Sequence, residues 1–374
     1  MKRTIFFSAM LIMLVIVSGC RQTAESQLQD VSSKVLVSGK KPKNIIFMIG
    51  DGMGISQVYA GMTANKGHLN LEKCAYTGLQ KTFSASDYIT DSAASGTAMA
   101  SGTKTKNGIL GKDTTGKDVK TILEYARDHG LATGLVATSA ITHATPASFI
   151  AHVKSRNQYE DIARFFIRHG PDVFIGGGRD NFASRKDGEN LLDSLKAQGY
   201  RVIFSMDSIE QVKHGKLAGL TAPVHNPPMT EGRGNMLPEA TATALNILSN
   251  DPDGFFIMIE GSQIDWGGHA NDQKYVITEM LDFDNAVKQA LDFAEKDGNT
   301  LVVITADHET GGMALNGGNL KTGKVEAAFT TKGHTAVMVP VFAYGPGAEN
   351  FTGIYDNTDI FRKFMALYGF SATD

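Results

Sequence analysis

The fold is decided by the stretch Asn44-Ile45-Ile46-Phe47-Met48-Ile49, which continues as Gly50-Asp51-Gly52-Met53-Gly54. A short, continuous apolar run that ends in glycines predicts a strand buried on both faces, as in a parallel sheet. The glycines lack the GxGxxG spacing of a dinucleotide-binding loop. Asp51 would repel a phosphate unless a cation lay between the two groups, so the segment favours a metal site over a nucleotide loop.

Apolar runs of the same kind alternate with amphipathic helical segments along the rest of the chain. We expect strands at residues 132–137, 173–175, 201–204, 255–259, 300–305 and 337–343, with helices between them, the longest at about 275–294. This alternation predicts an α/β fold with a mostly parallel central sheet and helices on both faces. No internal repeat or low-complexity boundary divides residues 44–374, which we expect to form one domain.

The N-terminal segment has the pattern of an export signal, with Lys2 and Arg3 before an apolar run over residues 5–17. This run is too short for an ordinary membrane span. It ends in Val17-Ser18-Gly19-Cys20, which resembles a bacterial lipoprotein cleavage box and predicts that Cys20 carries lipid. The alternative is a plain secretory signal in which the cysteine is incidental.

The cleavage box divides the chain into a lipoprotein signal peptide at 1–19, a polar flexible tether at 20–43 and the domain at 44–374. We expect an exported bacterial lipoprotein, anchored in a membrane through Cys20 and either periplasmic or on the cell surface. Cys74 is the other cysteine, so lipidation of Cys20 leaves no internal disulfide. The net charge of −3 and the lack of long basic runs give no electrostatic footprint for nucleic acid.

Three of the predicted strands end at or close to an acidic residue, namely Asp51, Glu260 and Asp307. The carboxyl ends of the strands form the active-site edge of an open α/β sheet. Three carboxylates gathered at one edge would repel one another unless cations neutralised them. The pattern therefore predicts a metal centre at this edge.

Histidines follow two of these strand ends closely and supply further candidate ligands. Asp265 and His269 are four residues apart, a spacing that lets both reach one metal, and the glycines between them favour a tight loop over a helix. Asp307-His308 is a second carboxylate–imidazole pair. Mixed aspartate and histidine ligands suit zinc. His214 and His225 lie in an irregular stretch without carboxylates, so we expect both at the surface.

The segment Asp91-Ser92-Ala93-Ala94-Ser95-Gly96 predicts a helix that begins at Ser92. A side chain at this position sits among unpaired backbone N–H groups at the positive end of the helix dipole. That environment suits a nucleophile that meets an anion such as phosphate. Serine and aspartate are also the usual helix caps, so it is the metal ligands elsewhere in the chain that favour the catalytic interpretation.

Taken together, these motifs resemble those of the alkaline phosphatases, in the same order over roughly residues 44–345. The matching segments are Gly50-Asp51-Gly52-Met53-Gly54, Thr90-Asp91-Ser92-Ala93-Ala94-Ser95, His143-Ala144-Thr145-Pro146, Ser155-Arg156, Glu260-Gly261, Asp265 with His269, Thr305-Ala306-Asp307-His308-Glu309, and Gly333-His334-Thr335.

The resemblance implies that residues 44–374 are a catalytic domain that hydrolyses phosphate monoesters with two zinc ions and one magnesium ion. Ser92 would be the nucleophile, forming a phosphoserine, and Arg156 would grip two phosphate oxygens. The implied ligands are Asp265, His269 and His334 for one zinc, Asp51, Asp307 and His308 for the other, and Asp51, Thr145 and Glu260 for magnesium.

Two positions depart from some bacterial members, which have aspartate at the position of His143 and lysine at that of Trp266. We expect His143 to hold a water bound to magnesium rather than to bind the ion itself. With histidine in place of a carboxylate, the site is expected to bind magnesium more weakly, and its mixed His, Asp and Glu side chains could attract zinc instead. Trp266 adds bulk and an N–H donor but no positive charge. Asp91, His143 and Trp266 are thus expected to surround the site without binding a metal.

Rival functions remain open from the sequence: a related phosphodiesterase, or a non-catalytic lipoprotein that binds metal or phosphate. The second would leave Ser92 without a purpose. A sulfatase is disfavoured because Ser92-Ala93-Ala94-Ser95-Gly96 lacks the Ser-x-Pro-x-Arg pattern. The expected partners are phosphate monoester substrates and a membrane, and a homodimer is left open.

Overall fold

The computed structural model describes residues 38–371, to which every structural statement below refers. The predicted signal peptide, the lipidation site Cys20 and most of the predicted tether lie outside these residues. Within them, no helix has both the length and the apolar character that crossing a membrane requires.

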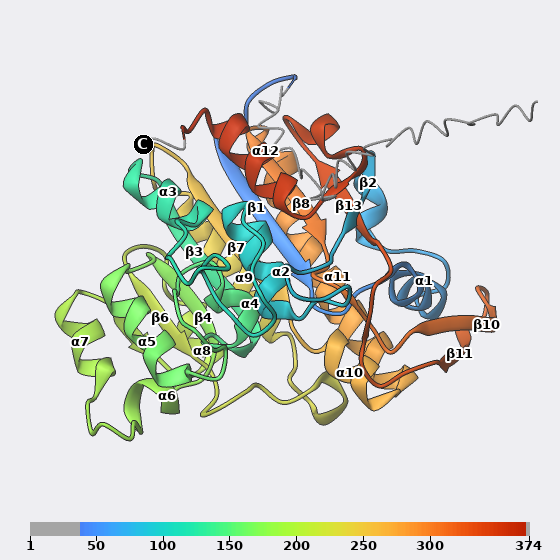
Figure 1. Ribbon diagram of the computed structural model, residues 1–374, viewed down its shortest axis with the longest axis horizontal. Helices are drawn as coiled ribbons and strands as arrows, with labels where there is room; N and C mark the ends of the chain where they lie inside the picture. Colours follow the sequence, from blue (N-terminus) through green and yellow to red (C-terminus); the bar gives the residue numbers. More distant parts are fainter. Residues whose placement is uncertain (1–37, 372–374) are drawn as a thin grey trace, which may run out of the picture. The chain divides into compact units, whose positions relative to one another are not determined.

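The described residues form a ten-stranded central sheet (Figure 1). Strand β13 (Val339–Tyr344) is antiparallel to both of its neighbours, and all other neighbouring pairs are parallel. The predicted mostly parallel α/β fold is therefore confirmed. The strands in spatial order are β14 (Gly353–Asp356), β2 (Tyr76–Lys81), β13 (Val339–Tyr344), β8 (Thr300–Thr305), β1 (Asn44–Gly50), β7 (Phe255–Gly261), β3 (Ala132–Ala140), β4 (Val173–Gly177), β6 (Leu217–Leu220) and β5 (Arg201–Ile203).

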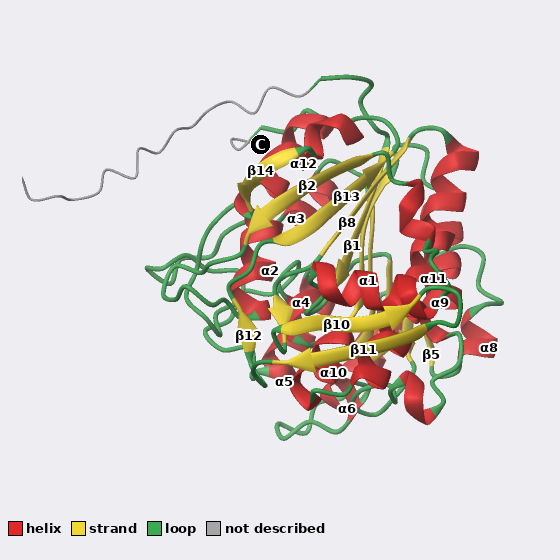
Figure 2. Cartoon of the chain, turned by 90° about the vertical axis from the view of Figure 1, so that its right-hand side faces the viewer, coloured by secondary structure: helices red, strands yellow, loops and turns green. Residues whose placement is uncertain are grey.

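Helices cover both faces of the sheet and connect its strands (Figure 2). Their bounds are α1 (Ile55–Ala64), α2 (Ser92–Ser101), α3 (Ile122–Asp128), α4 (Ala144–Ala147), α5 (Tyr159–Arg168), α6 (Asp180–Ala183), α7 (Leu191–Ala197), α8 (Met206–Ile209), α9 (Met236–Leu248), α10 (Ile264–Ala270), α11 (Gln273–Asp297) and α12 (Thr358–Tyr368). Short 3₁₀ turns occur at η1 (Asn70–Lys73), η2 (Met229–Glu231) and η3 (Ala348–Phe351).

The central strand β1 shows why its sequence belongs in the middle of the sheet. All seven of its residues are buried. Phe47 and its alternate neighbours face a core built with α2, α3, α5 and α12, whereas Met48 and its alternates face a core built with α1, α9 and α11. An apolar run without alternation is what a strand covered on both faces requires.

Pairing registers align the carboxyl ends of the central strands. Ile49 of β1 lies opposite Glu260 of β7 on one side and Thr305 of β8 on the other. Ala137 of β3 also lies opposite Glu260. Residues that follow these strand ends are consequently brought to one edge of the sheet.

Two small antiparallel sheets lie outside the central one. The hairpin of β10 (Met313–Asn319) and β11 (Lys324–Phe329) packs beside α1, and β9 (Glu309–Thr310) pairs with β12 (His334–Thr335). In this second pair His334 lies opposite Thr310. This pairing brings His334 close to the end of β8, although His334 lies 26 positions after His308 in the sequence.

Candidate metal centre and active site

The three strand-end carboxylates meet at the active-site edge as the sequence predicts. Asp51, Glu260 and Asp307 are each completely buried. Asp51 lies at the centre, because its carboxylate approaches Asp307 and His308 on one side and Glu260 and His143 on the other, with the ligand atoms of each group within 4.8 Å.

Cations fit this cluster, because several of its buried oxygen atoms make no hydrogen bond within the described structure. The buried side-chain atoms near the carboxylates that make no hydrogen bond there are Asp51 Oδ1 and Oδ2, His143 Nδ1, Thr145 Oγ1, Glu260 Oε1 and Asp307 Oδ2. Burying such atoms unpaired costs several kcal/mol, roughly 1–3 for each neutral group and more for a charged one. A divalent cation offsets that cost by accepting their lone pairs.

The pKa values of the carboxyl groups at this edge also favour a bound cation. Burial, with the charges of neighbouring carboxylates, raises the pKa of Asp51 well above its ordinary value. Burial raises the pKa of Glu260 to about 7 and that of Asp307 to about 6. The carboxylates thus hold protons readily unless a positive charge replaces them.

Asp265, His269 and His334 converge on a second point beside this cluster. Asp265 Oδ1 lies 3.3 Å from His269 Nε2 and 3.5 Å from His334 Nε2, and the two Nε2 atoms are 3.2 Å apart. The two Nδ1 atoms lie 2.5 Å from Lys332 O and 2.9 Å from Thr90 O, so each imidazole donates from Nδ1. This leaves both Nε2 lone pairs directed at a common metal position.

The predicted loop at Asp265–His269 is wrong, because these residues belong to helix α10. Their glycines serve close packing instead of a turn. A Cβ on Gly267 would lie 2.7 Å from the backbone nitrogen of Val276, and one on Gly268 would lie 2.8 Å from Thr310 O. The helix places Asp265 and His269 on one face, one turn apart.

His308 joins the two groups of ligands. Its Nε2 lies 3.4 Å from Asp51 Oδ1 and 3.3 Å from Asp307 Oδ2. Its ring stacks on that of His334 with centroids 3.5 Å apart. Burial, followed by the nearby charge of His334, lowers the pKa of His308 well below its ordinary value. The ring is therefore neutral, which is the form that binds a metal.

Ser92 is the first residue of α2, as expected, and it points at this centre. Its Oγ lies 3.3 Å from His308 Nε2, and the residue is only 2% exposed. Asp91 caps the helix by accepting a 2.9 Å hydrogen bond from the backbone N–H of Ala94. Asp91 thus caps the helix, while the hydroxyl of the adjacent Ser92 faces the cluster.

Arg156 comes from the segment between α4 and α5 and reaches the same place. Its Nη1 donates to Asp91 Oδ2 over 3.0 Å, and its Nη2 lies 3.4 Å from His143 Nε2. Gly108 N–H also donates to Asp91 Oδ2. One carboxylate thus caps the helix of Ser92 and orients the guanidinium beside it.

His143 lies beside the cluster. One of its ring nitrogens lies within 4.8 Å of carboxylate oxygens of Asp51 and Glu260. Burial, followed by the charge of Arg156, lowers the pKa of His143 to about 3. Its neutral ring stands edge-on to that of Trp266, with centroids 6.2 Å apart.

His225 is the residue that the sequence prediction misplaced, whereas His214 is exposed as expected. His225 Nδ1 accepts a 2.9 Å hydrogen bond from Ala140 N–H, and its ring stands 4.9 Å from that of Trp266. Part of the stretch predicted to be irregular is strand β6, whose end carries His225 toward the active-site edge. Recognising that strand would have identified this histidine.

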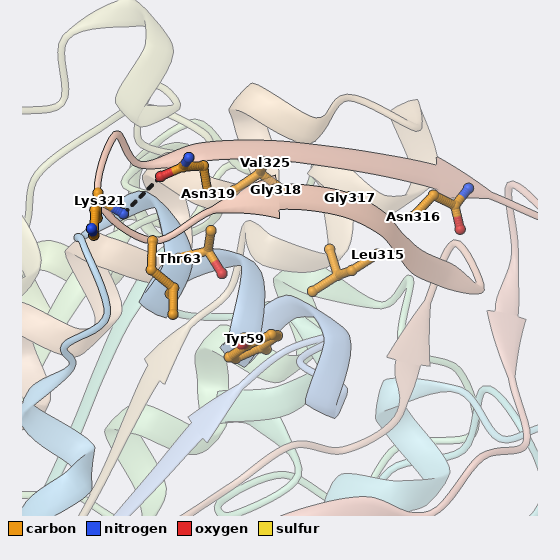
Figure 3. A pocket seen from close by; sticks show the side chains of 10 residues that line it. Tyr59, Thr63, Leu315, Asn316, Gly317, Gly318, Asn319, Lys321 and Val325 are labelled. Atoms are coloured by element: carbon orange, nitrogen blue, oxygen red, sulfur yellow. Dashed lines mark hydrogen bonds between the residues drawn. The ribbon is translucent and has the colours of Figure 1, made fainter.

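A separate cavity of about 660 Å³ lies between α1 and the β10–β11 hairpin (Figure 3). Tyr59 and Thr63 line it from α1, and residues 315–321 line it from the hairpin and its turn. None of the predicted site residues lines this cavity, so it is distinct from the metal centre.

The comparisons with known proteins agree with one another. A family model described as alkaline phosphatase matches residues 42–327 and 318–369. Alkaline phosphatase 3 of Bacillus subtilis is 37% identical to the chain over 87% of the chain and 89% of that protein. The alkaline phosphatase of Escherichia coli is 34% identical over 89% and 87%.

Solved structures give the same result. The alkaline phosphatase of the Antarctic bacterium TAB5 is 43% identical, with a TM-score of 0.84 over 89% of this chain and 100% of that chain. A histidine-to-aspartate variant of the Antarctic protein has magnesium bound in a site designated M3.

Proposed function

Because the chain belongs to the alkaline phosphatase family and is a metal-dependent hydrolase of phosphate monoesters, we propose that it acts through two zinc ions, one magnesium ion and a phosphoserine at Ser92. The observation that carries this proposal is the position of Ser92 Oγ, 3.3 Å from His308 Nε2 at a cluster of buried, unpaired carboxylate oxygens. A binding protein without catalysis would have no need for a hydroxyl there.

The proposed ligands divide into three sets that fit different metals, and Asp51 belongs to two of them. Nitrogen and oxygen donors suit zinc, and a set made mostly of oxygen atoms suits magnesium. When bound, the ions would supply Lewis-acid stabilisation of the attacking and leaving oxygens and a low-pKa water. The sets are Asp265, His269 and His334 for one zinc, Asp51, Asp307 and His308 for the other, and Asp51, Thr145 and Glu260 for magnesium.

The residues of the chain divide the reaction between them. Ser92 Oγ attacks the phosphorus in line, so the Oγ–P bond forms while the ester P–O bond breaks and the alcohol leaves. Water then attacks the same phosphorus, and the P–Oγ bond breaks to release inorganic phosphate. The N-terminus of α2 favours the negative phosphoryl group in both steps.

Arg156 would bind two phosphoryl oxygens with its planar guanidinium. Asp91 already holds this side chain from one side through Nη1. Burial works against the charged guanidinium, but the charge of Asp91 outweighs it and raises the pKa of Arg156. The guanidinium of Arg156 therefore stays positively charged.

An assay with phenyl phosphate tests this function against its rivals. The purified protein is expected to release phenol from the monoester, to release much less phenol from a diester with the same leaving group, and to lose the activity with chelator. Activity on the diester alone would favour the phosphodiesterase. No release from either ester would favour the non-catalytic binding protein.

We propose that His143 sets the magnesium affinity, and His143→Asp is expected to tighten magnesium binding by about tenfold or more. An added carboxylate beside Asp51 and Glu260 gives the ion a third negative charge in place of a neutral ring. The magnesium-containing histidine-to-aspartate variant of the Antarctic relative supports the direction. The measurement is a magnesium titration of metal-depleted protein refilled with two equivalents of zinc, with reversible activation as the readout.

His214→Asp is the matched control, since it makes the same change of charge at an exposed position. It should leave magnesium affinity unaltered. If His143→Asp leaves the affinity unchanged or weaker, the proposed role of His143 is wrong.

We also propose that Cys20 is lipidated and anchors the protein in a membrane. The small-residue box that ends in Cys20 supports this proposal. Stable anchoring needs more than one acyl chain, so the wild type is expected in detergent or membrane fractions and Cys20→Ser in the soluble fraction. Phase partitioning of both is the measurement. Equal solubility would indicate an ordinary cleaved signal.

A further inference from the structure

The backbone of Arg156 is placed by a pair of loop segments rather than by the central sheet or a long helix. Residues 151–156, the clamp segment, run antiparallel to residues 108–111, the facing segment. Leu110 and Val153 exchange backbone hydrogen bonds of 3.1 and 3.0 Å. Arg156 N–H donates to Gly108 O over 2.8 Å. Movement of the facing segment would therefore carry the guanidinium with it.

His152 lies inside this pair and bonds outward from both ring nitrogens. Its Nδ1 is 2.7 Å from Gly111 O, and its Nε2 is 3.0 Å from Glu124 Oε1. A carbonyl and a carboxylate oxygen only accept hydrogen bonds, so both nitrogens must carry hydrogen. His152 is thus an imidazolium, although its side chain is only 7% exposed.

The partners of His152 are themselves fixed. Glu124 Oε2 accepts from Thr121 N–H over 2.9 Å, which closes the capping box of α3. Gly111 has a φ of +61°, and a Cβ there would lie 2.2 Å from Ala151 O. The facing segment therefore approaches the clamp segment more closely than any side chain at Gly111 would allow.

Charges around the ring keep it protonated. Burial lowers the pKa of His152, but the hydrogen bond and charge of Glu124 outweigh it and raise the pKa above its ordinary value. Arg127 Nη1 lies 2.9 Å from His169 Nδ1, which must act as the acceptor. Burial lowers the pKa of His169, so the second histidine near Glu124 is neutral and does not compete for the carboxylate charge.

We propose that His152 is a positioning residue for phosphate binding, acting through Arg156. Its charged ring ties the clamp segment to the facing segment and to α3, and so holds the guanidinium in register with Ser92. His152 does not touch the substrate. The inference rests on the proposed grip of Arg156 on phosphate. The alternative is a buried ion pair that contributes to stability alone.

A double-mutant cycle separates these two roles. His152→Gln keeps a polar side chain but cannot donate to both acceptors. We expect it to raise KM for phenyl phosphate and Ki for inorganic phosphate by about tenfold, with kcat changed by less than about threefold. In an Arg156→Ala background the same substitution should change neither constant further, because its effect passes through the missing side chain.

Glu124→Gln is the milder second variant, since its amide oxygen can still accept from His152 Nε2. It should also raise Ki for inorganic phosphate, by a smaller factor than His152→Gln. It keeps the test available if His152→Gln does not fold. His214→Gln is the control for an exposed histidine and should leave KM, Ki and melting temperature unchanged.

The inference would be overturned if His152→Gln raised Ki equally in the wild-type and Arg156→Ala backgrounds. It would also be overturned if His152→Gln and Glu124→Gln lowered the melting temperature and left Ki unchanged. The single variant Arg156→Ala distinguishes failure of the proposed phosphate grip of Arg156 from failure of the proposed role of His152. If that variant binds phosphate as tightly as wild type, the proposed grip of Arg156 fails and the role of His152 fails with it. If Arg156→Ala weakens phosphate binding and His152→Gln does not, the role of His152 alone is wrong.

Discussion

Ser92→Ala is expected to lose at least about 10³-fold in kcat on phosphate monoesters while keeping its full complement of metal ions. The Oγ of Ser92 is the nucleophile in the proposed reaction, so its removal leaves water to attack the ester directly. The proposed metal ligands all lie on other residues. Initial-rate kinetics and metal analysis of the same preparation measure both parts of the prediction.

Ser95→Ala provides the matched control, because Ser95 is a buried serine one turn along the same helix. Its Oγ donates to Asp307 O over 2.8 Å and accepts from Asn357 Nδ2 over 3.1 Å, which is a structural role. Its loss should cost about 1–3 kcal/mol in stability and leave most of the activity. Equal losses of kcat in the two variants would contradict the assignment of Ser92 as nucleophile.

Removing the metals is expected to lower kcat by at least about 10³-fold, with recovery on adding two equivalents of zinc but not on adding magnesium alone. Without cations the buried carboxylates repel one another, and Glu260 and Asp307 titrate at pKa values of about 7 and about 6. Dialysis against chelator, refilling and activity assay at fixed pH form the measurement.

The same pKa values predict how metal affinity changes with pH. Glu260 and Asp307 are proton-free above their raised pKa values and take up protons as pH falls through about 7 and then about 6. Protons then compete with cations, so metal affinity should fall steadily over that range. Metal affinity that is flat between pH 8 and 5.5, or full activity after complete metal removal, would contradict the account.

The sequence was sufficient for the strands that build the active-site edge. Ile45 to Ile49 are apolar without alternation, and only a strand covered on both faces buries every such residue. Because parallel strands end at one edge, the sequence pattern alone places together the acidic residues at the ends of β1, β7 and β8. The helix start at Ser92 followed from the small residues after an aspartate cap.

Other parts of the site depend on contacts that local sequence patterns do not encode. Gly267 and Gly268 suggest a turn, but they are needed where α10 approaches Val276 and Thr310. His225 follows the short strand β6 in a segment rich in proline, so residue propensities did not reveal the strand or the position of His225 near the active-site edge. His152 differs from a surface histidine only through Gly111 and Glu124, which are 41 and 28 residues away in sequence.

Trapping of the covalent intermediate tests directly whether Ser92 is the nucleophile. The wild-type protein is mixed with a phosphate monoester, quenched in acid within the first turnovers, digested and examined by mass spectrometry. We expect one phosphorylated peptide, with the phosphate on Ser92 and none on the matching peptide of Ser92→Ala. Phosphate on any other residue, or rapid hydrolysis with no phosphorylated peptide, would contradict it.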